Sequence, residues 1–212
     1  MKLLSELPVK EFLLVTAGDD PVPGGGSVSA LCGALSAALG QMVTNLTIGR
    51  KKYAEQEENM KEMAVVFNTC LDEFAKAIDA DSNAYNTVFS AYKLPKETER
   101  EKTIRTQKIQ EAIKIAAEVP FQVAQKTYKM MDFISIVAKT GNQNAVTDAC
   151  VAMMCARTAV LGALLNVRIN LTSIQDLEYV DNLKRECDRI EEKAIEKEQK
   201  LLAWLKSVLN NF

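Results

Sequence analysis

Glycine and proline are confined to a few points of this 212-residue chain, and their placement favours a fold built from long helices. No glycine occurs between Arg50 and Thr140, where only Pro95 and Pro120 interrupt, and neither residue type occurs after Gly162. The β-branched residues are scattered and do not alternate with polar ones, as they would in a half-buried strand. The sequence therefore predicts an all-α fold.

Apolar residues at three- and four-residue steps, together with these helix breakers, place the expected elements along the chain. A short helix over residues 9–16 leads into a loop that ends at Gly26, and residues 166–176 are expected to form another loop. The long helices are expected over residues 27–52, 55–92, 96–138 (with a kink or break at Pro120), 145–165 and about 177–209.

These elements predict a single domain over residues 1–212. Residues 1–26 would supply the short helix and a glycine-rich loop, and residues 27–212 the helical bundle. A helix over residues 55–92 would be about 55 Å long, which exceeds the width of a compact domain of this size. We therefore expect an oligomer in which another copy covers the flanks of the helices.

Composition and charge exclude several classes of function. The net charge of −2 gives no basic surface for nucleic acid, and the absence of histidine excludes an imidazole base. Five cysteines without a CxxC pair, and an N-terminus without a signal-peptide pattern, predict a cytoplasmic protein without disulfides or structural zinc. The most apolar window, residues 28–48, contains several amide and hydroxyl side chains, so we expect a buried helix rather than a membrane span.

A glycine-rich turn at the start of the first long helix is the first candidate site. Gly24, Gly25 and Gly26 leave the backbone N–H groups accessible, and Ser27 is a natural N-cap for the helix that follows. The start of a helix carries unpaired N–H donors and a partial positive charge, so it could bind a phosphate or carboxylate. The alternative is a flexible loop that only leads into the helix.

Two aspartates two residues apart form the second candidate. Asp81 falls on the apolar stripe of its helix, where burial would raise the pKa of the carboxyl and suit it to acid–base chemistry near neutral pH. Asp79 lies about 160° around the same helix, so the two carboxylates do not share a face. The alternative is a solvated or ion-paired carboxylate.

Other polar residues are candidates for ligand contacts, each with a structural alternative. Asn45 lies in a very apolar helix, where a polar side chain needs either a ligand or a facing helix as a partner. Arg50 and Lys51 could clamp a carboxylate-bearing tail, or could only complement the end of their helix. The remaining candidates, which could contact a heterocycle or merely hold loops and cap helices, are Asn142, Asp148, Asn166 and Asn170.

Four separated segments, taken in order, resemble the cyclodeaminase domain of the formiminotransferase-cyclodeaminase family. This family has stand-alone bacterial relatives that include methenyltetrahydrofolate cyclohydrolases. The resemblance spans about residues 7–204 and implies an up-and-down bundle of about five long helices that forms a homodimer, with folate bound near the subunit interface. The segments are residues 23–53 (beginning PGGGS), 79–96 (beginning DADSN), 116–124 (AAEVPFQVA) and 141–171 (beginning GNQNAVTDAC).

The resemblance also implies a reaction. A tetrahydrofolate derivative would be the substrate, without a metal: 5-formiminotetrahydrofolate would give 5,10-methenyltetrahydrofolate and ammonia, with Asp81 or Asp79 as the acid–base residue. The glutamate carboxylates of the folate would meet the glycine turn and Arg50–Lys51. Transfer of the formimino group is not implied. The alternatives are a cyclohydrolase acting on the same carbon and a non-catalytic helical module, which would leave Asp81 exposed and replaceable.

Overall fold

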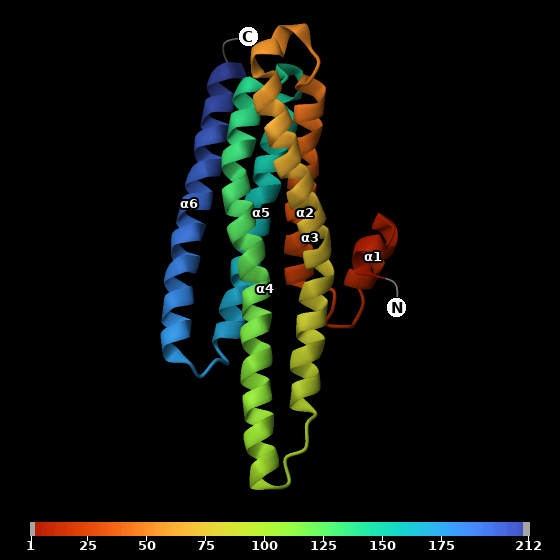
Figure 1. The fold of residues 1–212 in the computed structure, drawn as a ribbon, viewed down its shortest axis with the longest axis vertical. Helices are drawn as coiled ribbons and strands as arrows, with labels where there is room; N and C mark the ends of the chain where they lie inside the picture. Colours follow the sequence, from red (N-terminus) through yellow and green to blue (C-terminus); the bar gives the residue numbers. More distant parts are fainter. Residues whose placement is uncertain (1–2, 210–212) are drawn as a thin grey trace.

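The computed structural model describes residues 3–209, and its long helices run alternately up and down (Figure 1). Three short 3₁₀ segments, Leu4–Glu6, Lys51–Gln56 and Gln143–Ala145, accompany the helices, and no strand occurs in this part of the chain. The all-α class and the five long helices expected from the sequence are confirmed. The helices are α1 (Val9–Thr16), α2 (Gly25–Thr47), α3 (Glu57–Tyr92), α4 (Glu99–Thr140), α5 (Val146–Leu171) and α6 (Leu177–Leu209).

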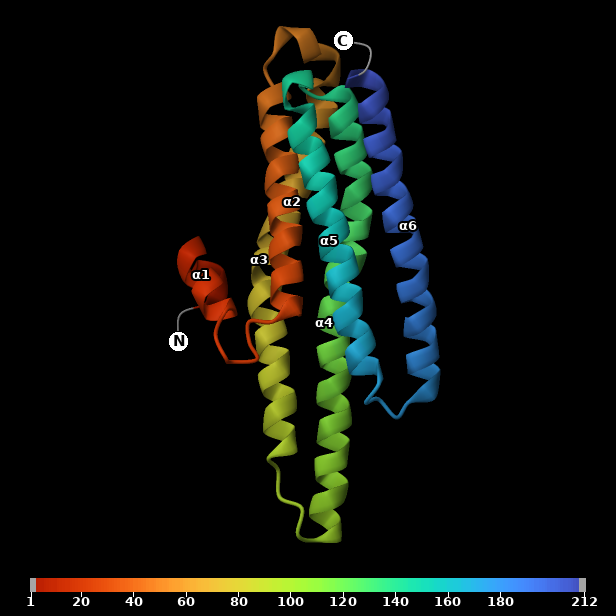
Figure 2. The same cartoon turned by 180° about the vertical axis from the view of Figure 1, so that it is seen from behind.

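Four helices, α2 to α5, form the centre of the bundle, and α6 packs along α4 and α5 (Figure 1). The short helix α1 stands beside the bundle and buries only Phe12. The hairpin of α3 and α4 extends well beyond the ends of the other helices (Figure 2). The single domain over residues 1–212 stays a prediction, and residues 1–2 and 210–212 lie outside the described part.

The first long helix begins and ends earlier than expected. Helix α2 starts at Gly25, with Gly24 as its N-cap, so Ser27 lies inside the first turn instead of capping it. The helix ends at Thr47 rather than Lys52, because Gly49 takes a φ of 75°, which ends the right-handed helical path. Arg50 and Lys51 therefore lie beyond the helix, where a 3₁₀ segment begins.

Helix α5 extends through most of the segment expected to be a loop. It runs to Leu171, so Asn166 and Asn170 are helical and lie one turn apart. Their side-chain amides bond to backbone carbonyls: Nδ2 of Asn166 to Gly162 O at 2.8 Å, and Nδ2 of Asn170 to Asn166 O at 2.9 Å. The expected loop is thus wrong for residues 166–171, because these amides are satisfied within the helix.

Helix α4 passes Pro120 without the break that the sequence allowed. Proline has no N–H, so the carbonyl of Ala116, four residues earlier, loses its helical partner. Nδ2 of Asn170 on α5 donates to this carbonyl at 2.9 Å. A neighbouring helix thus supplies the missing donor, and α4 continues as one helix from Glu99 to Thr140.

Two stretches of the bundle, Gly25–Thr47 and Gln143–Leu171, are long and apolar enough to cross a membrane by length and composition alone. In the bundle, 56% and 50% of their most apolar windows are buried against other helices. About half of each window is therefore buried by packing, and several apolar side chains of α2 and α5, including Leu35 and Leu165, are exposed.

Candidate functional site

Three glycines of α2 face three side chains of α3 at seven-residue intervals. Seven residues are close to two helical turns (about 3.6 residues each), so all three contacts lie on one face of each helix. At each pair a Cβ on the glycine would lie within 3.2 Å of the facing side chain, so the small residues set how closely the helices approach. The pairs are Gly40 with Phe67, Gly33 with Phe74, and Gly26 with Asp81.

Asp81 therefore takes the position that a phenylalanine ring holds at the other two pairs. A Cβ on Gly26 would lie 2.0 Å from Oδ1 of Asp81, which leaves room for glycine alone while the carboxylate keeps its place. The Ser27 hydroxyl lies 3.0 Å from Oδ2 of Asp81, 3.0 Å from Ile78 O and 3.2 Å from the Ser82 hydroxyl. Packing between α2 and α3 fixes this carboxylate at the first turn of α2.

Burial raises the pKa of the Asp81 carboxyl above its usual range, and hydrogen bonds from the side chain and backbone of Ser27 act in the opposite direction. The start of α2 was expected to attract an anion, and here the chain itself supplies one. A half-buried carboxyl with a raised pKa, held by a serine, is suited to accept a proton and later release it.

A pocket of about 330 Å³ opens beside Asp81 and brings together residues from the loop and all four central helices. Of the residues singled out in the sequence, the glycine turn, Asp81, Asn166 and Asn170 line it, and Ser27 lies buried beneath Asp81. Its full lining is Pro21, Val22, Gly24, Gly25, Gly26, Asp81, Tyr85, Val88, Ala116, Asn166, Ile169 and Asn170.

Asn166 and Asn170 have mainly structural partners at this wall. Nδ2 of Asn170 already donates to two carbonyls, Ala116 O and Asn166 O, so both of its N–H groups are used. Nδ2 of Asn166 lies 3.2 Å from where a Cβ on Gly25 would stand, which places this amide directly against the glycine turn. The two amides thus fix the backbone around the pocket, and each keeps an amide oxygen as an acceptor.

Asp79 has a different role from Asp81. Its carboxylate accepts hydrogen bonds from the Leu4 backbone N–H at 2.7 Å and from the Ser5 hydroxyl at 2.6 Å. It does not line the pocket. Asp79 therefore anchors the N-terminal segment to α3.

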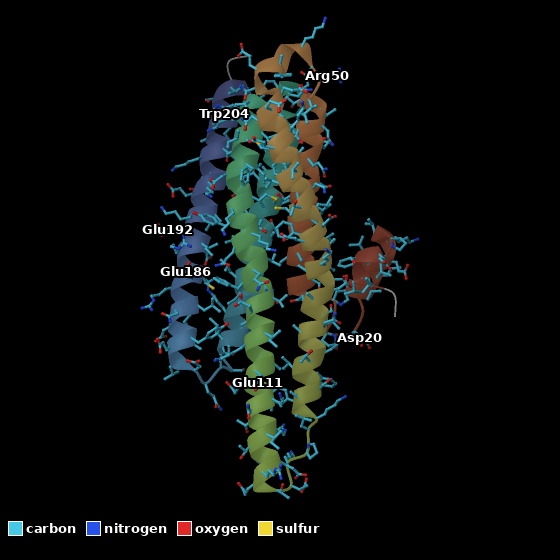
Figure 3. All side chains as sticks on the ribbon, viewed as in Figure 1. Asp20, Arg50, Glu111, Glu186, Glu192 and Trp204 are labelled. Carbon is cyan, nitrogen blue, oxygen red and sulfur yellow. The ribbon has the colours of Figure 1, made fainter. Side chains whose placement is uncertain are left out.

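The remaining candidates lie at the opposite end of α2. This helix is about 34 Å long at 1.5 Å per residue, and Asn45, Arg50 and Lys51 are exposed at its far end. Figure 3 shows Arg50 there, far from Asp20 in the loop that leads to the pocket. Within one subunit, these three residues cannot contact a ligand held beside Asp81.

Asn142 and Asp148 lie at that same far end. Asn142 bonds to Leu46 O at 3.0 Å and accepts from the Asn144 N–H at 3.1 Å, so it joins helix ends. Asp148 lies in the first turn of α5, where a carboxylate complements the helix start. Within one subunit, Asn142 thus holds helix ends together and Asp148 lies at a helix start. This is the alternative given above, in which such residues hold loops and cap helices instead of contacting a heterocycle.

Several lining residues were not singled out in the sequence, above all Tyr85, Val88 and Ile169. Tyr85 follows Asp81 by one helical turn, which was a usable signal, but its place on the apolar stripe suggested core packing. Ile169 lay in the expected loop. The spacing of Gly26, Gly33 and Gly40 was the signal that could have paired α2 with Asp81.

In residues 3–209, no group of three or more cysteine, aspartate or glutamate side chains is placed to hold a metal ion. The expected independence from metal stays a prediction.

Comparison with known proteins gives consistent matches over almost the whole chain. The sequence model of the family described as Formiminotransferase-cyclodeaminase matches residues 8–189. The methenyltetrahydrofolate cyclohydrolase of Methylorubrum extorquens is 36% identical over 202 residues, which cover 95% of this chain and 97% of that relative. The formimidoyltransferase-cyclodeaminase of Gallus gallus is 32% identical over 198 residues, covering 93% of this chain but 37% of the chicken protein.

A solved structure, the formiminotetrahydrofolate cyclodeaminase of Thermotoga maritima, superposes with a TM-score of 0.86 at 28% identity. The alignment covers 97% of this chain and 99% of that one. This chain is thus similar in full length to two stand-alone proteins, and spans little more than a third of the chicken relative.

Proposed function

Because the chain belongs to the formiminotransferase-cyclodeaminase family, we propose that it is an enzyme acting on the one-carbon unit of tetrahydrofolate. The leading reaction is cyclodeamination of 5-formiminotetrahydrofolate to 5,10-methenyltetrahydrofolate and ammonia. The observation that carries the proposal is the Asp81 carboxylate, which is half-buried in a pocket between four helices with its pKa raised by burial. A helical module without catalysis would leave that carboxylate exposed.

We assign the proton transfers to Asp81. N10 of the folate attacks the carbon of the protonated formimino group on N5, and the Asp81 carboxylate takes the N10 proton. The carboxyl then gives that proton to the amino group, and the C–N bond breaks to release ammonia. The carboxylate ends ionised beside the methenyl cation and stabilises it. The raised pKa suits both steps, because it makes the carboxylate a stronger base toward N10 and keeps the proton on the carboxyl until the amino group takes it.

Cyclohydrolase activity is the second candidate, and the whole-length similarity to the Methylorubrum extorquens enzyme favours it. In this reaction water adds to the methenyl carbon while the Asp81 carboxylate takes one of its protons. The carboxyl then gives that proton to one of the two nitrogens as its bond to the carbon breaks, and the hydroxyl proton leaves as the C=O bond of a formyl group forms on the other nitrogen. Both reactions use one carboxylate at the same carbon. The pocket geometry therefore suits either reaction.

One pair of assays separates the candidates. The purified protein is incubated with 5-formimino- or 5,10-methenyltetrahydrofolate while methenyl absorbance and ammonia are followed. Ammonia release with rising methenyl absorbance supports cyclodeamination; loss of methenyl absorbance, with no ammonia from the formimino compound, supports cyclohydrolysis. A folded protein that changes neither compound would reject both.

We also propose a homodimer that packs through the outer face of α2 and α5. This face is apolar, and within residues 3–209 no other helix of the subunit covers it (Figure 2). An antiparallel arrangement would bring the partner's Arg50 and Lys51 toward the pocket, which would restore their expected contact with a carboxylate tail. The exposed apolar side chains on this face are Leu35, Leu46, Val151, Met154 and Leu165.

The remaining expectations stay predictions: a cytoplasmic location, no metal cofactor, and no binding to nucleic acid or membrane.

A further inference from the structure

The pocket continues along α3, onto the face of that helix that lies beyond the start of α2. Helix α2 begins at Gly25, opposite Asp81, so the face of α3 that α2 covers at Phe67 and Phe74 is open beyond this point. Figure 1 shows the α3–α4 hairpin extending past the ends of α2 and α5. The exposed face carries three aromatic side chains, which we call the aromatic shelf: Tyr85, Phe89 and Tyr92.

The shelf leads from the pocket to two cations, Lys93 and Arg105. Tyr85 lines the pocket, and its ring is nearly parallel to that of Phe89, with an interplanar angle of 12° and 6.4 Å between centroids. Nζ of Lys93 lies 4.0 Å from the centroid of the Phe89 ring. The guanidinium of Arg105 lies 5.6 Å from the centroid of the Tyr92 ring and donates to Tyr92 O at 3.0 Å.

The three aromatic side chains are between 41% and 50% exposed and follow one another along α3, and a contiguous exposed apolar surface of this kind often marks a binding site. Two features identify what fits. The shelf is continuous with the pocket through Tyr85, so one ligand can occupy both. Positive charge lies at its far end, so the outer part of that ligand should be anionic.

We propose that the aromatic shelf binds the aminobenzoyl-glutamate part of the folate substrate. This inference rests on the proposed function. In tetrahydrofolate the aminobenzoyl ring is bonded directly to N10, and the glutamate carboxylates lie beyond it. A reacting centre at Asp81 therefore places the ring over Tyr85 and Phe89 and the carboxylates near Lys93. From Asp81 to Lys93 is 12 residues, about 18 Å along the helix, enough for an extended tail.

Within one subunit, this arrangement assigns contact with the tail to Lys93. Arg50 and Lys51 cannot reach the pocket of their own subunit, whereas Lys93 is on the same helix as Asp81. Stacking holds an aromatic ring without specifying its chemistry, and the cation then selects ligands with a carboxylate. The shelf thus acts in binding and should leave the chemical step unchanged.

The test measures steady-state kinetics of Phe89→Ala, together with equilibrium binding of 5,10-methenyltetrahydrofolate in an Asp81→Asn background. We expect KM and Kd to rise about fivefold to tenfold, with kcat within about twofold. Val65→Ala is the matched control, because Val65 is 67% exposed on the same helix but remote from the pocket. Unchanged KM and Kd, or a fall in kcat alone, would overturn the proposal that the shelf binds the substrate.

A second variant tests the cation at the end of the shelf. Lys93→Ala should raise Kd for methenyltetrahydrofolate about threefold to tenfold, and should leave binding of the pteroate analogue, which lacks glutamate, unchanged. Lys102→Ala is the control, since Lys102 lies on the same hairpin and pairs with Glu99. Equal loss for both ligands would overturn the assignment of Lys93.

Light scattering on each variant identifies the competing explanation. If Phe89→Ala changes the oligomeric state while Kd stays the same, the shelf is a surface for another copy of the chain and the inference is wrong. If the unaltered protein neither binds nor converts a folate, the proposed function itself fails. If the unaltered protein binds and converts folate, and the shelf variants bind it with the same affinity, only the role of the shelf in binding is rejected.

Discussion

The Ser27 hydroxyl lies 3.0 Å from Oδ2 of Asp81, across 54 positions of sequence. The contact joins the first turn of α2 to the second half of α3, so a carboxylate from one helix sits at the start of another. The partial positive charge and the free N–H groups at this helix start stabilise the ionised form, while burial opposes it. These two influences act on the pKa of the carboxyl in opposite directions, and burial is the larger.

Asp81→Asn should lower kcat at least about 100-fold, because the amide can neither take the N10 proton nor return one to the leaving group. The variant should keep its fold, since an amide oxygen can still accept from Ser27. Steady-state kinetics and circular dichroism check both points. Asp79→Asn is the matched control: it should stay active, because Asp79 holds Leu4 and Ser5 instead of lining the pocket. Full activity in the Asp81 variant would move the catalytic assignment to Asp79.

The raised pKa of Asp81 predicts how stability changes with pH. Between the unfolded pKa, about 3.9, and the higher folded value, the folded state binds the proton more tightly, so the free energy of unfolding falls as pH rises. Asp81→Asn removes this titration. Urea unfolding of both proteins from pH 4 to pH 8 should therefore show the variant gaining stability relative to the parent. A relative loss at high pH would mean that the folded pKa is lowered.

Gly26→Ala should displace the carboxylate, because the new Cβ would lie 2.0 Å from Oδ1 of Asp81. We expect kcat to fall at least about tenfold, since a shift of about 1 Å in a reacting group can have a large effect on rate. Gly33→Ala is the control. Its Cβ would lie 3.2 Å from the Phe74 ring, so it should lower the melting temperature while kcat stays near the parent value. Equal effects of the two changes on kcat would contradict the role of Gly26.

Asn170 and Pro120 should be coupled in stability. Asn170→Ala leaves the buried Ala116 carbonyl without its donor and should cost about 1–3 kcal/mol of unfolding free energy. In a Pro120→Ala background, the new N–H of residue 120 can bond that carbonyl, so the same change should cost less. A double-mutant cycle by urea denaturation measures the difference. Additive effects would show that Asn170 does not compensate for the proline.

The outer face of α2 and α5 predicts the oligomeric state. Leu35→Glu places a charge in the middle of this apolar face, where Leu35 is 49% exposed, and should convert a dimer to a monomer. Val65→Glu is the control, because Val65 is 67% exposed on α3, outside this face. Multi-angle light scattering reads the mass of each protein. A parent protein that is monomeric at all concentrations would reject the dimer.

The sequence by itself determined the helices and the different faces of α3 on which Asp81 and Asp79 lie. Long stretches without glycine or proline, in which apolar residues recur at three- and four-residue steps, leave few alternatives to helix, and α1 and α3 follow the expected bounds closely. Helical periodicity also separated Asp81 from Asp79, because the side of a helix on which a residue lies depends only on local geometry. The structure agrees, placing Asp81 in the pocket and Asp79 outside it.

Only the tertiary structure decided which candidates meet. The Asn170 amide bonds to the Ala116 carbonyl on α4, a partner that exists only after packing. Arg50 looks near the glycine turn in sequence, but a rigid helix of 23 residues keeps the two apart. Gly26 and Asp81 are distant in sequence, and the close approach of α2 and α3 presses them together. Local periodicity fixes the direction of each side chain, whereas long-range packing fixes its neighbours.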